Sequence, residues 1–552
     1  MHDKTLEQTL LKARIDNNPT EFMHLLSQIP ERQIFSAQFA AYLDAIETLP
    51  LQHLFEIGSI TPMAGHSLGP HFIPTRKKIN EVLDLQKAKL HEGHFPETRQ
   101  EGGDWYRCDR DPQSIAAMRS MLGNFEEGEV VFSHKGLSDL LGEVIPTFYE
   151  PCLEDWLRGK TSICFLGKEF ISDQTIIETT LKREINRRRC DKAFRPFTDL
   201  PEPTVDSLML GIRPNGYGLY TEQDIIDFVK NNAAKIQLLH LSHIVFSTGQ
   251  RLDLHKIVSA LKDVIAEHEI IVGVDLAHTT GNRPIDLPSL NITYAAGCAY
   301  KFASGSAGTG GFLYVNNKAD LKKHQPIQGW VAVEDPSKAF KHIDGKKADN
   351  QESITACTNA DNQEGIKMCD RGAIAFVRSN PSPIAVAAMQ AFAKHMHMVG
   401  WESLVSKSEC LTRYMIALLK YKLGDKIKFI TPEDAEKRGA MIVFQIKGLL
   451  DVKPIENLLK EESPLGRFDS DIRPPKNIRL TAQCYISFFD IHNVVCRLTE
   501  VVHQMLAKQA VVNKTPAVKC AENFRIFSFL HRSANPVSAN ETSAQQPIQA
   551  KL

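Results

Sequence analysis

The sequence predicts an α/β fold, with a large domain built on a mostly parallel sheet flanked by helices and a smaller C-terminal α/β domain. Between residues 56 and 375, short apolar runs that end in polar or glycine turns alternate with amphipathic segments. Two of these runs, 236–247 and 269–278, enclose a segment with apolar residues at helical spacing, the pattern of a strand–helix–strand unit with parallel strands. The chain of 552 residues is too long for one compact core, so two domains with extensions are expected.

The composition is that of an ordinary soluble globular protein. Apolar residues make up 43% and charged residues 24%, and the net charge of -1 favours neither nucleic acid nor an anionic membrane as partner. No apolar run is long enough to span a membrane, and the N-terminus lacks the apolar core of a signal peptide. The 11 cysteines form no C-x-x-C pair, which predicts reduced thiols in a cytoplasmic protein and no metal site.

The expected elements follow the chain in order. Apolar periodicity over residues 4–50 predicts short helices, which form an N-terminal extension of residues 1–55. The strands expected in the large domain are 161–167, 236–247 and 269–278, with a helix over 250–268. The smaller domain is expected to contain a strand over 440–446 and a closing helix over 490–507. The predicted boundaries are 56–383 for the large domain, 384–510 for the smaller one, and 511–552 for a tail that is largely disordered from about residue 533.

Three polar segments interrupt this pattern. The basic segment 182–195 is interpreted as a solvated helix face or loop rather than a nucleic-acid site. Pro201, Pro203 and the turn at 213–218 predict a loop-rich connection. Residues 331–365 are polar and poor in large aliphatic side chains, which predicts a long surface insertion.

The stretch 274–311 places several reactive groups around one glycine-rich turn. Asp275 ends an apolar run, and His278 follows it. Tyr300 and Lys301 then precede a run of small residues. A lysine in a defined pocket can form a Schiff base, and a carboxylate at a strand end can pair with a pyridinium nitrogen. Backbone amides of a small-residue turn can bind phosphate. Together these features predict pyridoxal phosphate as cofactor.

Each of these residues alone is more often structural. An aspartate at a strand end is usually a turn or cap residue, a Tyr-Lys pair usually lies on the surface, and a run of small residues is usually a loop. Their order and spacing support the chemical interpretation. The competing phosphate-binding motifs, G-x-x-x-x-G-K-[ST] and G-x-G-x-x-G after the first strand, are absent.

Segments spread along the chain resemble the kynureninase family. They are GHSLG (65–69), FISD (170–173), FSTGQ (246–250), VGVDLAHTTGN (272–282), CAYKFASGSAGTGG (298–311), QGW (328–330), RSNPSPI (378–384) and NIRLTAQCYISFFD (477–490). The resemblance extends, with gaps, from residue 60 to residue 505. It implies pyridoxal 5'-phosphate as cofactor, the aspartate-aminotransferase fold (PLP-dependent transferase fold type I) and a homodimer.

The resemblance also implies an activity. The family hydrolyses carbon–carbon bonds in ketonic substances, in the degradation of tryptophan and the biosynthesis of NAD. The expected reaction cleaves the Cβ–Cγ bond of L-kynurenine or 3-hydroxykynurenine to give anthranilate or 3-hydroxyanthranilate and L-alanine. The sequence does not decide between the two substrates.

Roles of single residues follow from the resemblance in the same way. The implied catalytic residues are Lys301, which would form the Schiff base, Tyr300, which would relay protons, and Asp275, which would pair with the pyridine nitrogen. The implied cofactor-binding residues are Leu137, Ser138, Phe170, Ser172, Asp173, Ser242, Asp275, His278, Tyr300, Lys301, Trp330 and Asn380. On the substrate side, Arg479 would bind the α-carboxylate as a two-pronged ion pair. The other implied substrate-binding residues are Asn380, Ser67 and His94.

The sequence departs from the family pattern on the substrate side. His66 replaces the asparagine of the family's G-N-S-L-G segment. The segment that usually holds a substrate-contacting histidine and tryptophan offers His91, His94 and Trp105, and which histidine faces the substrate stays open.

Two alternatives remain open at the level of sequence. One is another enzyme of the same fold, such as a cysteine desulfurase or an aminotransferase. A desulfurase needs a mobile, exposed nucleophilic cysteine, and Cys484 is the one near a matched substrate-side segment. The other alternative is a cofactor-binding protein without enzymatic activity.

Overall fold

The computed structural model describes residues 21, 24–25, 28–46, 51–90, 108–194, 202–333 and 367–514. The chain divides into two units, Met1–His503 and Gln504–Leu552. All strands described below belong to the first unit, and the described part of the second unit is helical. His91, His94 and Trp105, the predicted insertion beyond residue 333 and the predicted tail beyond residue 514 lie outside the described residues, whereas residues 511–514 of that tail are helical.

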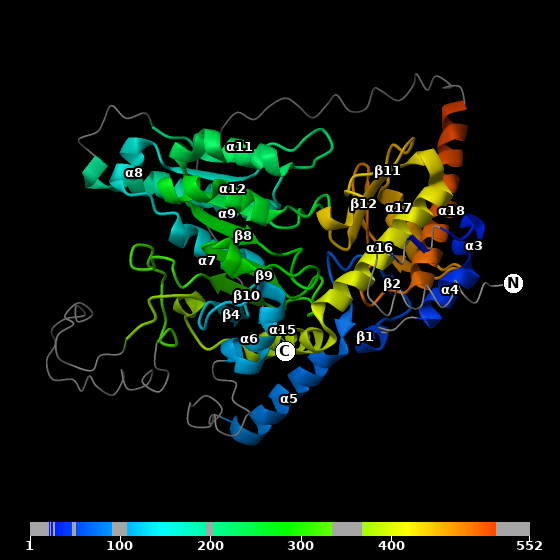
Figure 1. Cartoon of the computed structure of the whole chain (residues 1–552), viewed down its shortest axis with the longest axis horizontal. Coiled ribbons are helices and arrows are strands. Elements are labelled where there is room, and N and C mark those ends of the chain that lie inside the picture. Colours follow the sequence, from blue (N-terminus) through cyan, green and yellow to red (C-terminus); the bar gives the residue numbers. More distant parts are fainter. Residues whose placement is uncertain are drawn as a thin grey trace, which may run out of the picture. The chain divides into compact units, whose positions relative to one another are not determined.

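The larger sheet has seven strands in the order β4–β10–β9–β8–β7–β5–β6 (Figure 1). In that order the strands are Val130–Ser133, Gly311–Val315, Tyr294–Cys298, Ile271–Asp275, Ile236–Ser242, Ser162–Leu166 and Met209–Ile212. Strand β10 runs antiparallel to both of its neighbours, whereas the other neighbouring pairs are parallel. The prediction of a mostly parallel sheet is therefore confirmed.

The three strands that the sequence predicts in this part are β5, β7 and β8. Strand β7 is buried along its whole length, as expected for a central strand of a sheet covered on both faces. It ends at Ser242, so the predicted strand over 236–247 is too long. The backbone turns there instead, and the N–H of Val245 donates a hydrogen bond to the carbonyl of Gln250 at 2.8 Å.

The sequence patterns do not predict the other four strands of this sheet. Strand β9 contains two alanines and a glycine, which have low β propensity. Its small residues serve close packing, because a Cβ at Gly297 would lie 2.4 Å from the ring of Phe312 on β10. Strand β6 lies inside the connection predicted to be loop-rich, and that prediction is wrong for Met209–Ile212. It is an edge strand, and only one of its four residues is fully buried.

Helices α7 (Leu137–Phe148) and α9 (Ile171–Cys190) pack side by side against this sheet. Helix α12 (Leu254–Glu267), which the periodicity predicts, connects β7 to β8 and lies beside α11 (Glu222–Asn232) (Figure 1). The remaining helices of this part are α5 (Ile73–Lys89), α6 (Pro112–Leu122), α8 (Leu153–Arg158), α10 (Val205–Leu208), α13 (Leu287–Leu290) and α15 (Pro383–Val399).

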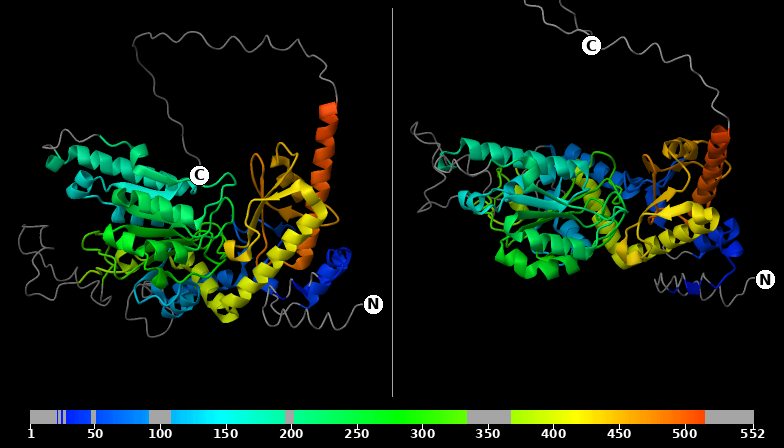
Figure 2. Two further views of the ribbon diagram at one scale, coloured as in Figure 1. Left: turned by 45° about the horizontal axis from the view of Figure 1, so that its top comes forward. Right: turned by 90° about the horizontal axis from the view of Figure 1, so that it is seen from above.

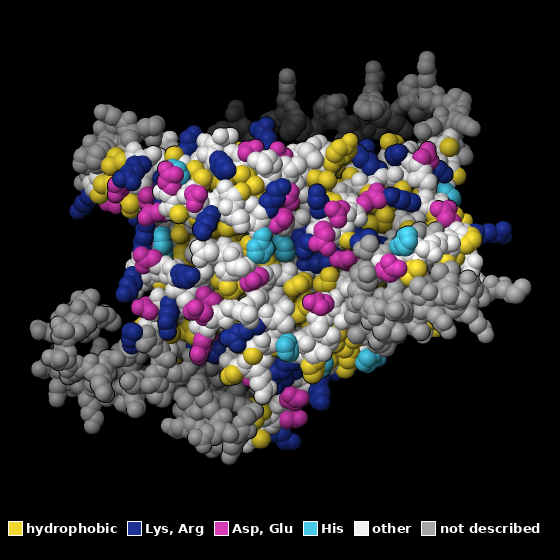
Figure 3. Space-filling view, viewed as in Figure 1, with side chains coloured by type: hydrophobic (Ala, Val, Ile, Leu, Met, Phe, Trp, Pro, Cys, Tyr) yellow, Lys and Arg dark blue, Asp and Glu magenta, His cyan; other side chains and the backbone are white. Residues whose placement is uncertain are grey.

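The described part of the basic segment, residues 182–194, forms the last turns of α9 and a short 3-10 helix. The side chains of Arg183 and Arg189 are more than half exposed, which confirms the interpretation as a solvated helix face. On the face shown in Figure 3, basic and acidic side chains are interspersed, as the small net charge leads one to expect.

The smaller sheet has four antiparallel strands in the order β11–β12–β15–β14. They are Ile427–Phe429, Met441–Ile446, Asn477–Thr481 and Asp471–Arg473. The helices of this part are α16 (Trp401–Leu423), α17 (Lys453–Lys460) and α18 (Phe488–Lys514). The predicted strand over 440–446 and closing helix over 490–507 are confirmed as β12 and part of α18. The domain boundaries stay predictions.

The N-terminal helices α3 (Glu31–Ile34) and α4 (Ala37–Ala45) lie against α16 and the start of α18 (Figure 2). The hydroxyl of Tyr414 on α16 donates to the carbonyl of Ile34 at 3.4 Å. The carboxylate of Asp44 accepts the backbone N–H groups of Phe488 at 2.8 Å and Phe489 at 2.9 Å. These amides begin α18, where a helix leaves N–H groups unpaired, so Asp44 caps a helix more than 440 residues later in the chain.

The segment after α4 links the two sheets. It contains β1 (Phe55–Glu56), β2 (Thr61–Pro62) and β3 (His71–Phe72); β1 pairs with β3, and β2 pairs with β13 (Phe468–Asp469). The carbonyl of Met63 accepts the N–H of Thr481 on β15 at 2.7 Å. Six residues later, the N–H of Gly69 donates to the carbonyl of Tyr300 at 2.9 Å. A Cβ at Gly69 would lie 2.3 Å from the carbonyl oxygen of Lys301, so this close approach requires glycine.

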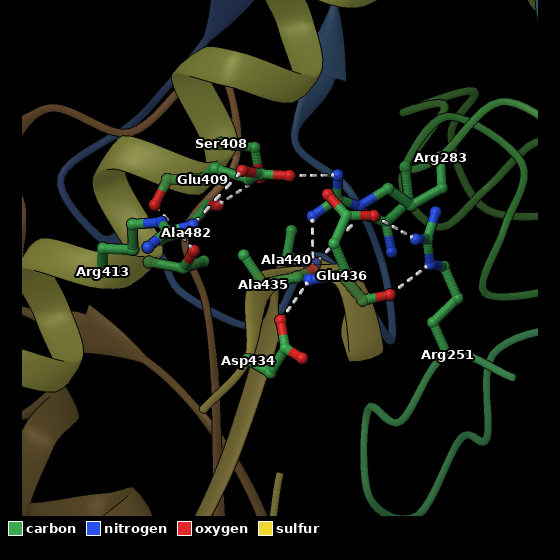
Figure 4. A network of polar contacts seen from close by, with 12 residues as sticks. Arg251, Arg283, Ser408, Glu409, Arg413, Asp434, Ala435, Glu436, Ala440 and Ala482 are labelled. Carbon is green, nitrogen blue, oxygen red and sulfur yellow. Dashed lines mark hydrogen bonds and ion pairs between the residues drawn. The ribbon is translucent and has the colours of Figure 1, made fainter. Parts of the chain in front are cut away.

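A network of charged residues also links the two sheets (Figure 4). Arg283, in the loop after β8, donates to the carboxylate of Glu409 on α16 at 2.6 Å, and both side chains are less than one tenth exposed. Arg251, which follows β7, binds the carbonyl and the carboxylate of Glu436 at 2.8 and 2.6 Å. The pair of Arg283 and Glu409 is buried, so removal of either side chain would leave the other charge buried without compensation.

Replacing Glu409 by alanine is therefore expected to lower the free energy of unfolding by about 3–5 kcal/mol, because Arg283 then stays buried without its carboxylate. Urea denaturation measures this loss. Glu154→Ala is the matched control, since it removes the carboxylate of an exposed pair with Arg158 on α8 and is expected to cost about 1 kcal/mol or less. Equal losses in the two variants would contradict the structural role assigned to Glu409.

Candidate functional site

A cavity of about 240 Å³ lies at the carboxyl ends of β5, β7 and β8, the edge where open α/β sheets bind ligands. The residues that line it are Gly136, Leu137, Ser138, Asp139, Leu141, Glu169, Phe170, Ser172, Asp173, Ser242, Ile244, Phe246, Asp275, Ala277, His278, Tyr300 and Lys301. Every predicted cofactor-binding residue except Trp330 and Asn380 is among them.

The parallel pairing of β7 and β8 places Ser242 directly opposite Asp275, at the last position of each strand. The Asp275 carboxylate is buried and accepts the backbone N–H of Ala277 at 2.5 Å. Burial, together with the negative charge of Asp173, raises the pKa of Asp275 to about 7. A positively charged ring nitrogen beside this carboxylate would reverse that shift, which suits Asp275 as the partner of a pyridinium.

Lys301 is held by the loop that follows β9. The backbone N–H of Ser304 donates to its carbonyl at 2.9 Å. The Lys301 Nζ lies 5.9 Å from the ring centre of Phe170 and 5.7 Å from that of Tyr300. Burial raises the pKa of the Tyr300 phenol, so the hydroxyl keeps its proton at neutral pH. The amine thus lies between two aromatic rings on the wall of the cavity.

The other end of the cavity is formed by the first turns of α7 and α9. Helix α7 begins at Leu137, and the hydroxyls of Ser138 on α7 and Ser172 on α9 are 2.5 Å apart. The first turn of a helix carries N–H groups without helical partners and a partial positive charge. Two such helix ends with adjacent hydroxyls form a suitable site for a phosphate.

His278 is buried beside Asp275 and packs edge-on against Phe302 with ring centres 5.8 Å apart. Burial, and then the charge of Lys301, lower the pKa of His278 well below its usual value. Its Nδ1 has no hydrogen-bond partner among the described residues. The neutral ring therefore offers one polar atom and a flat apolar surface.

Two buried residues of the site are not found from the sequence. His240, on β7, lies 3.2 Å from the carboxylate of Asp173 and 3.2 Å from the hydroxyl of Tyr294. Burial lowers the pKa of His240, but the hydrogen bond to Asp173 and the negative charges of the surrounding carboxylates together outweigh burial, so the pKa is raised. The histidine inside the apolar run LLHL is the sequence signal that could have revealed His240.

The second such residue is Glu169, between β5 and α9. Its side chain lines the cavity, and the residue is only 3% exposed. Its Oε1 accepts the hydroxyl of Ser242 at 2.6 Å. Burial and the charges of Asp173 and Asp275 raise the pKa of Glu169 to about 8. Its place immediately before the FISD segment is the one sequence signal that it gives.

Arg479, the predicted substrate-binding arginine, lies on β15 next to the cavity rather than in its lining. Its Nη1 donates to the carbonyl of Phe246, which lines the cavity, at 2.9 Å, and its Nη2 pairs with the carboxylate of Asp471. The Nε has no partner among the described residues. His66 lies 3.4 Å from Asp471 and 2.6 Å from the hydroxyl of Thr481, and burial lowers the pKa of His66 to about 4.

The remaining predicted site residues lie elsewhere. Ser67 is exposed, and Trp330, at 40% exposure, lies outside the cavity lining, as does Asn380. Over the described residues, no helix combines the length and apolarity that a bilayer crossing requires. The same residues contain no group of three or more His, Cys, Asp or Glu side chains placed to hold a metal ion.

The residues of the cavity fit pyridoxal phosphate. An amine, a buried carboxylate and a pair of helix N-termini face one space, as an aldehyde, a pyridine nitrogen and a phosphate require. Oε2 of Glu169 and Nδ1 of His278 have no hydrogen-bond partner among the described residues, and a ligand in the cavity would supply one to each.

Comparison with known proteins supports this assignment. The family described as "Kynureninase C-terminal domain" matches residues 404–498, and "Aminotransferase class-V" matches residues 211–345. The chain is 26% identical over 447 residues to the kynureninase of Dictyostelium discoideum, which covers 79% of this chain and 86% of that protein. It is 27% identical over 475 residues to the kynureninase of Saccharomyces cerevisiae, with 81% and 92% covered.

Solved structures resemble this fold at low sequence identity. The apo cysteine desulfurase of Thermococcus onnurineus NA1 superimposes with a TM-score of 0.58 at 14% identity and covers 81% of this chain and 95% of that one. The cystine C–S lyase C-DES, with glycine linked covalently to its PLP cofactor, gives 0.59 at 15% identity and covers 81% and 99%. The predicted fold class, resemblance to the kynureninases, status as an enzyme and PLP cofactor are thus confirmed.

Asp275→Ala is expected to weaken the binding of pyridoxal phosphate by about 100-fold or more, because one half of a buried charge pair is lost. Titration of the cofactor-free chain with pyridoxal phosphate, followed by absorbance, measures this change. Asp263→Asn, which removes an exposed carboxylate on α12, should bind as the unaltered chain does. Equal affinities of the Asp275 variant and the unaltered chain would contradict the assigned role.

Proposed function

Because the chain resembles the kynureninases along most of its length, we propose that it is a PLP-dependent hydrolase that cleaves the Cβ–Cγ bond of L-kynurenine or 3-hydroxykynurenine. The products are anthranilate or 3-hydroxyanthranilate and L-alanine, with water as the second reactant. The supporting observation is that Lys301, Asp275 and the N-terminus of α7 converge on one cavity.

The residues of the cavity have separate tasks in this proposal. Bound pyridoxal phosphate supplies an electron-withdrawing ring that stabilises negative charge at the substrate Cα. Asp275 keeps the ring nitrogen protonated. The amine of Lys301 would hold the cofactor and would also serve as the base for the Cα proton of the substrate. Tyr300 keeps its phenolic proton at neutral pH and relays protons beside the amine.

The substrate side rests on Arg479 and its neighbours. Arg479 binds the α-carboxylate. Its Nε has no partner among the described residues and can donate one more hydrogen bond. Asp471, on β14, already holds Nη2 and so fixes the orientation of the guanidinium. His66 is uncharged because burial lowers its pKa to about 4, so the change from the family's asparagine adds no charge near Arg479.

The cysteine desulfurase alternative finds no support in the cavity. Among the described residues that line it there is no cysteine. Cys484, the nearest candidate by sequence, is 4% exposed, whereas a desulfurase needs a mobile and accessible thiolate. An assay that compares the fluorescence of anthranilate with the release of sulfide separates the two reactions.

Lys301→Ala is expected to reduce the cleavage of kynurenine by more than about 10,000-fold, since proton transfer alone contributes about 100- to 10,000-fold and the covalent anchor is also lost. The yellow absorbance of the protein should disappear as well. Anthranilate fluorescence and a visible spectrum measure both effects. Lys230→Ala, at an exposed position of α11, is the matched control. Normal turnover by the Lys301 variant would refute the proposed function.

We also propose that the enzyme is a homodimer in which Trp330 and Asn380 complete the cavity of the partner subunit. The support is that both residues match cofactor-binding positions of the family and neither lies in the cavity of its own chain. The cytoplasmic location remains a prediction.

Complementation tests the dimer. If Trp330 serves the partner, the variants Lys301→Ala and Trp330→Ala should each have low activity. Mixed after reversible dissociation, they should regain about a quarter of the original activity, because half of the dimers are hybrid and each hybrid has one intact site. Recovery measured by anthranilate fluorescence supports the arrangement. No recovery, with hybrids verified by differently tagged chains, would contradict it.

A further inference from the structure

Glu169 is an acid group that the roles proposed above leave without a task. It follows β5, lines the cavity and is almost fully buried. One carboxyl oxygen, Oε1, accepts hydrogen bonds from the Ser242 hydroxyl at 2.6 Å and from the Phe170 N–H at 3.3 Å. The other oxygen, Oε2, has neither a hydrogen-bond partner among the described residues nor contact with solvent. Buried polar atoms normally have a hydrogen-bond partner, so we expect Oε2 to bind an atom of a ligand in the cavity.

The charges around Glu169 decide which form of the carboxyl is present. Asp173 from α9 and Asp275 from β8 face it with negative charge, and His240 from β7 faces it with positive charge. Burial, and then the two carboxylates, raise its pKa to about 8. The hydroxyl of Tyr220, which precedes α11, is a neutral neighbour, since burial raises its pKa to about 12. At neutral pH Glu169 is therefore a neutral acid, and its proton makes it a hydrogen-bond donor.

The polar atoms of pyridoxal phosphate can be assigned one by one. Asp275 is suited to the ring nitrogen, Lys301 to the aldehyde, and the N-termini of α7 and α9 to the phosphate. The phenolic oxygen of the ring is the one polar atom left. It carries negative charge when ionised and accepts hydrogen bonds. A neutral carboxyl donates to such an oxygen, whereas a carboxylate repels it.

We propose that Glu169, through its protonated carboxyl, donates a hydrogen bond to the phenolic oxygen of pyridoxal phosphate, and that loss of this proton weakens cofactor binding at alkaline pH. Ser242 donates to the other carboxyl oxygen and so fixes the orientation of the group. The inference rests on the PLP enzyme proposed above, but its test does not depend on which substrate is cleaved.

The test uses pyridoxine 5'-phosphate, which lacks the aldehyde and so cannot react with Lys301. Its affinity for the cofactor-free, full-length chain is measured between about pH 6.5 and pH 9.5, a range that spans the ionisation of the buried acid. In the unaltered chain, affinity should fall by about tenfold or more across this range, since a hydrogen bond to a charged group is lost. Glu169→Gln keeps a neutral donor at every pH, so its affinity should fall less across this range than that of the unaltered chain, and the remaining fall reports the ring nitrogen and Asp275.

Two further variants serve as controls. Glu169→Ala removes the donor and should bind about tenfold more weakly at neutral pH, with the same smaller alkaline fall as Glu169→Gln. Glu178→Gln makes the same chemical change on the exposed side of α9 and should retain the profile of the unaltered chain. Circular dichroism verifies that each variant is folded.

The result that would overturn the inference is a pH profile of Glu169→Gln that superimposes on that of the unaltered chain. Neutral-pH binding by Glu169→Ala at full strength would overturn it too. Both results are compatible with normal cleavage of kynurenine, so they leave the proposed function intact. Conversely, strong cofactor binding with the expected pH profiles but no anthranilate would refute the proposed reaction and leave the inference standing.

Discussion

The buried hydrogen bond between Asp173 and His240 is the interaction on which the cavity depends. Three acid groups, at Glu169, Asp173 and Asp275, face one space from which water is largely excluded. Three uncompensated carboxylates there would be prohibitively unfavourable. His240 forms a hydrogen bond with Asp173, burial favours the protonated form of Glu169, and Asp275 remains for a cationic ligand. The cavity thus has one place for a positive ring nitrogen, at the end of β8.

The sequence predicts this edge of the sheet well, for a physical reason. Apolar runs that end in a polar residue mark the ends of buried parallel strands, and Ser242 and Asp275 both end such runs. The register of β7 and β8 then brings the two residues opposite each other. Family-like segments add Phe170, Tyr300 and Lys301, which indeed line the same cavity.

Other features depend on contacts that no local pattern encodes. Strand β9 is held by its neighbours, not by the propensity of its alanines and glycine. The chemical state of Glu169 arises from Asp173 and Asp275, which come from other elements, so a sequence window around Glu169 contains only part of the cause. Arg479 likewise depends on Phe246, 233 positions earlier, for its placement beside the cavity.

The cap that Asp44 places on α18 has a consequence for how the protein is made. The two partners are 444 residues apart, with nearly the whole chain between them. The residues of α18 that Asp44 caps are translated more than 440 residues after Asp44 itself. The same helix, α4, carries the apolar residues Phe39 and Leu43, which are buried in the folded protein. Because this contact joins residues so far apart in the chain, its formation carries a large loop-closure cost and is expected late in folding.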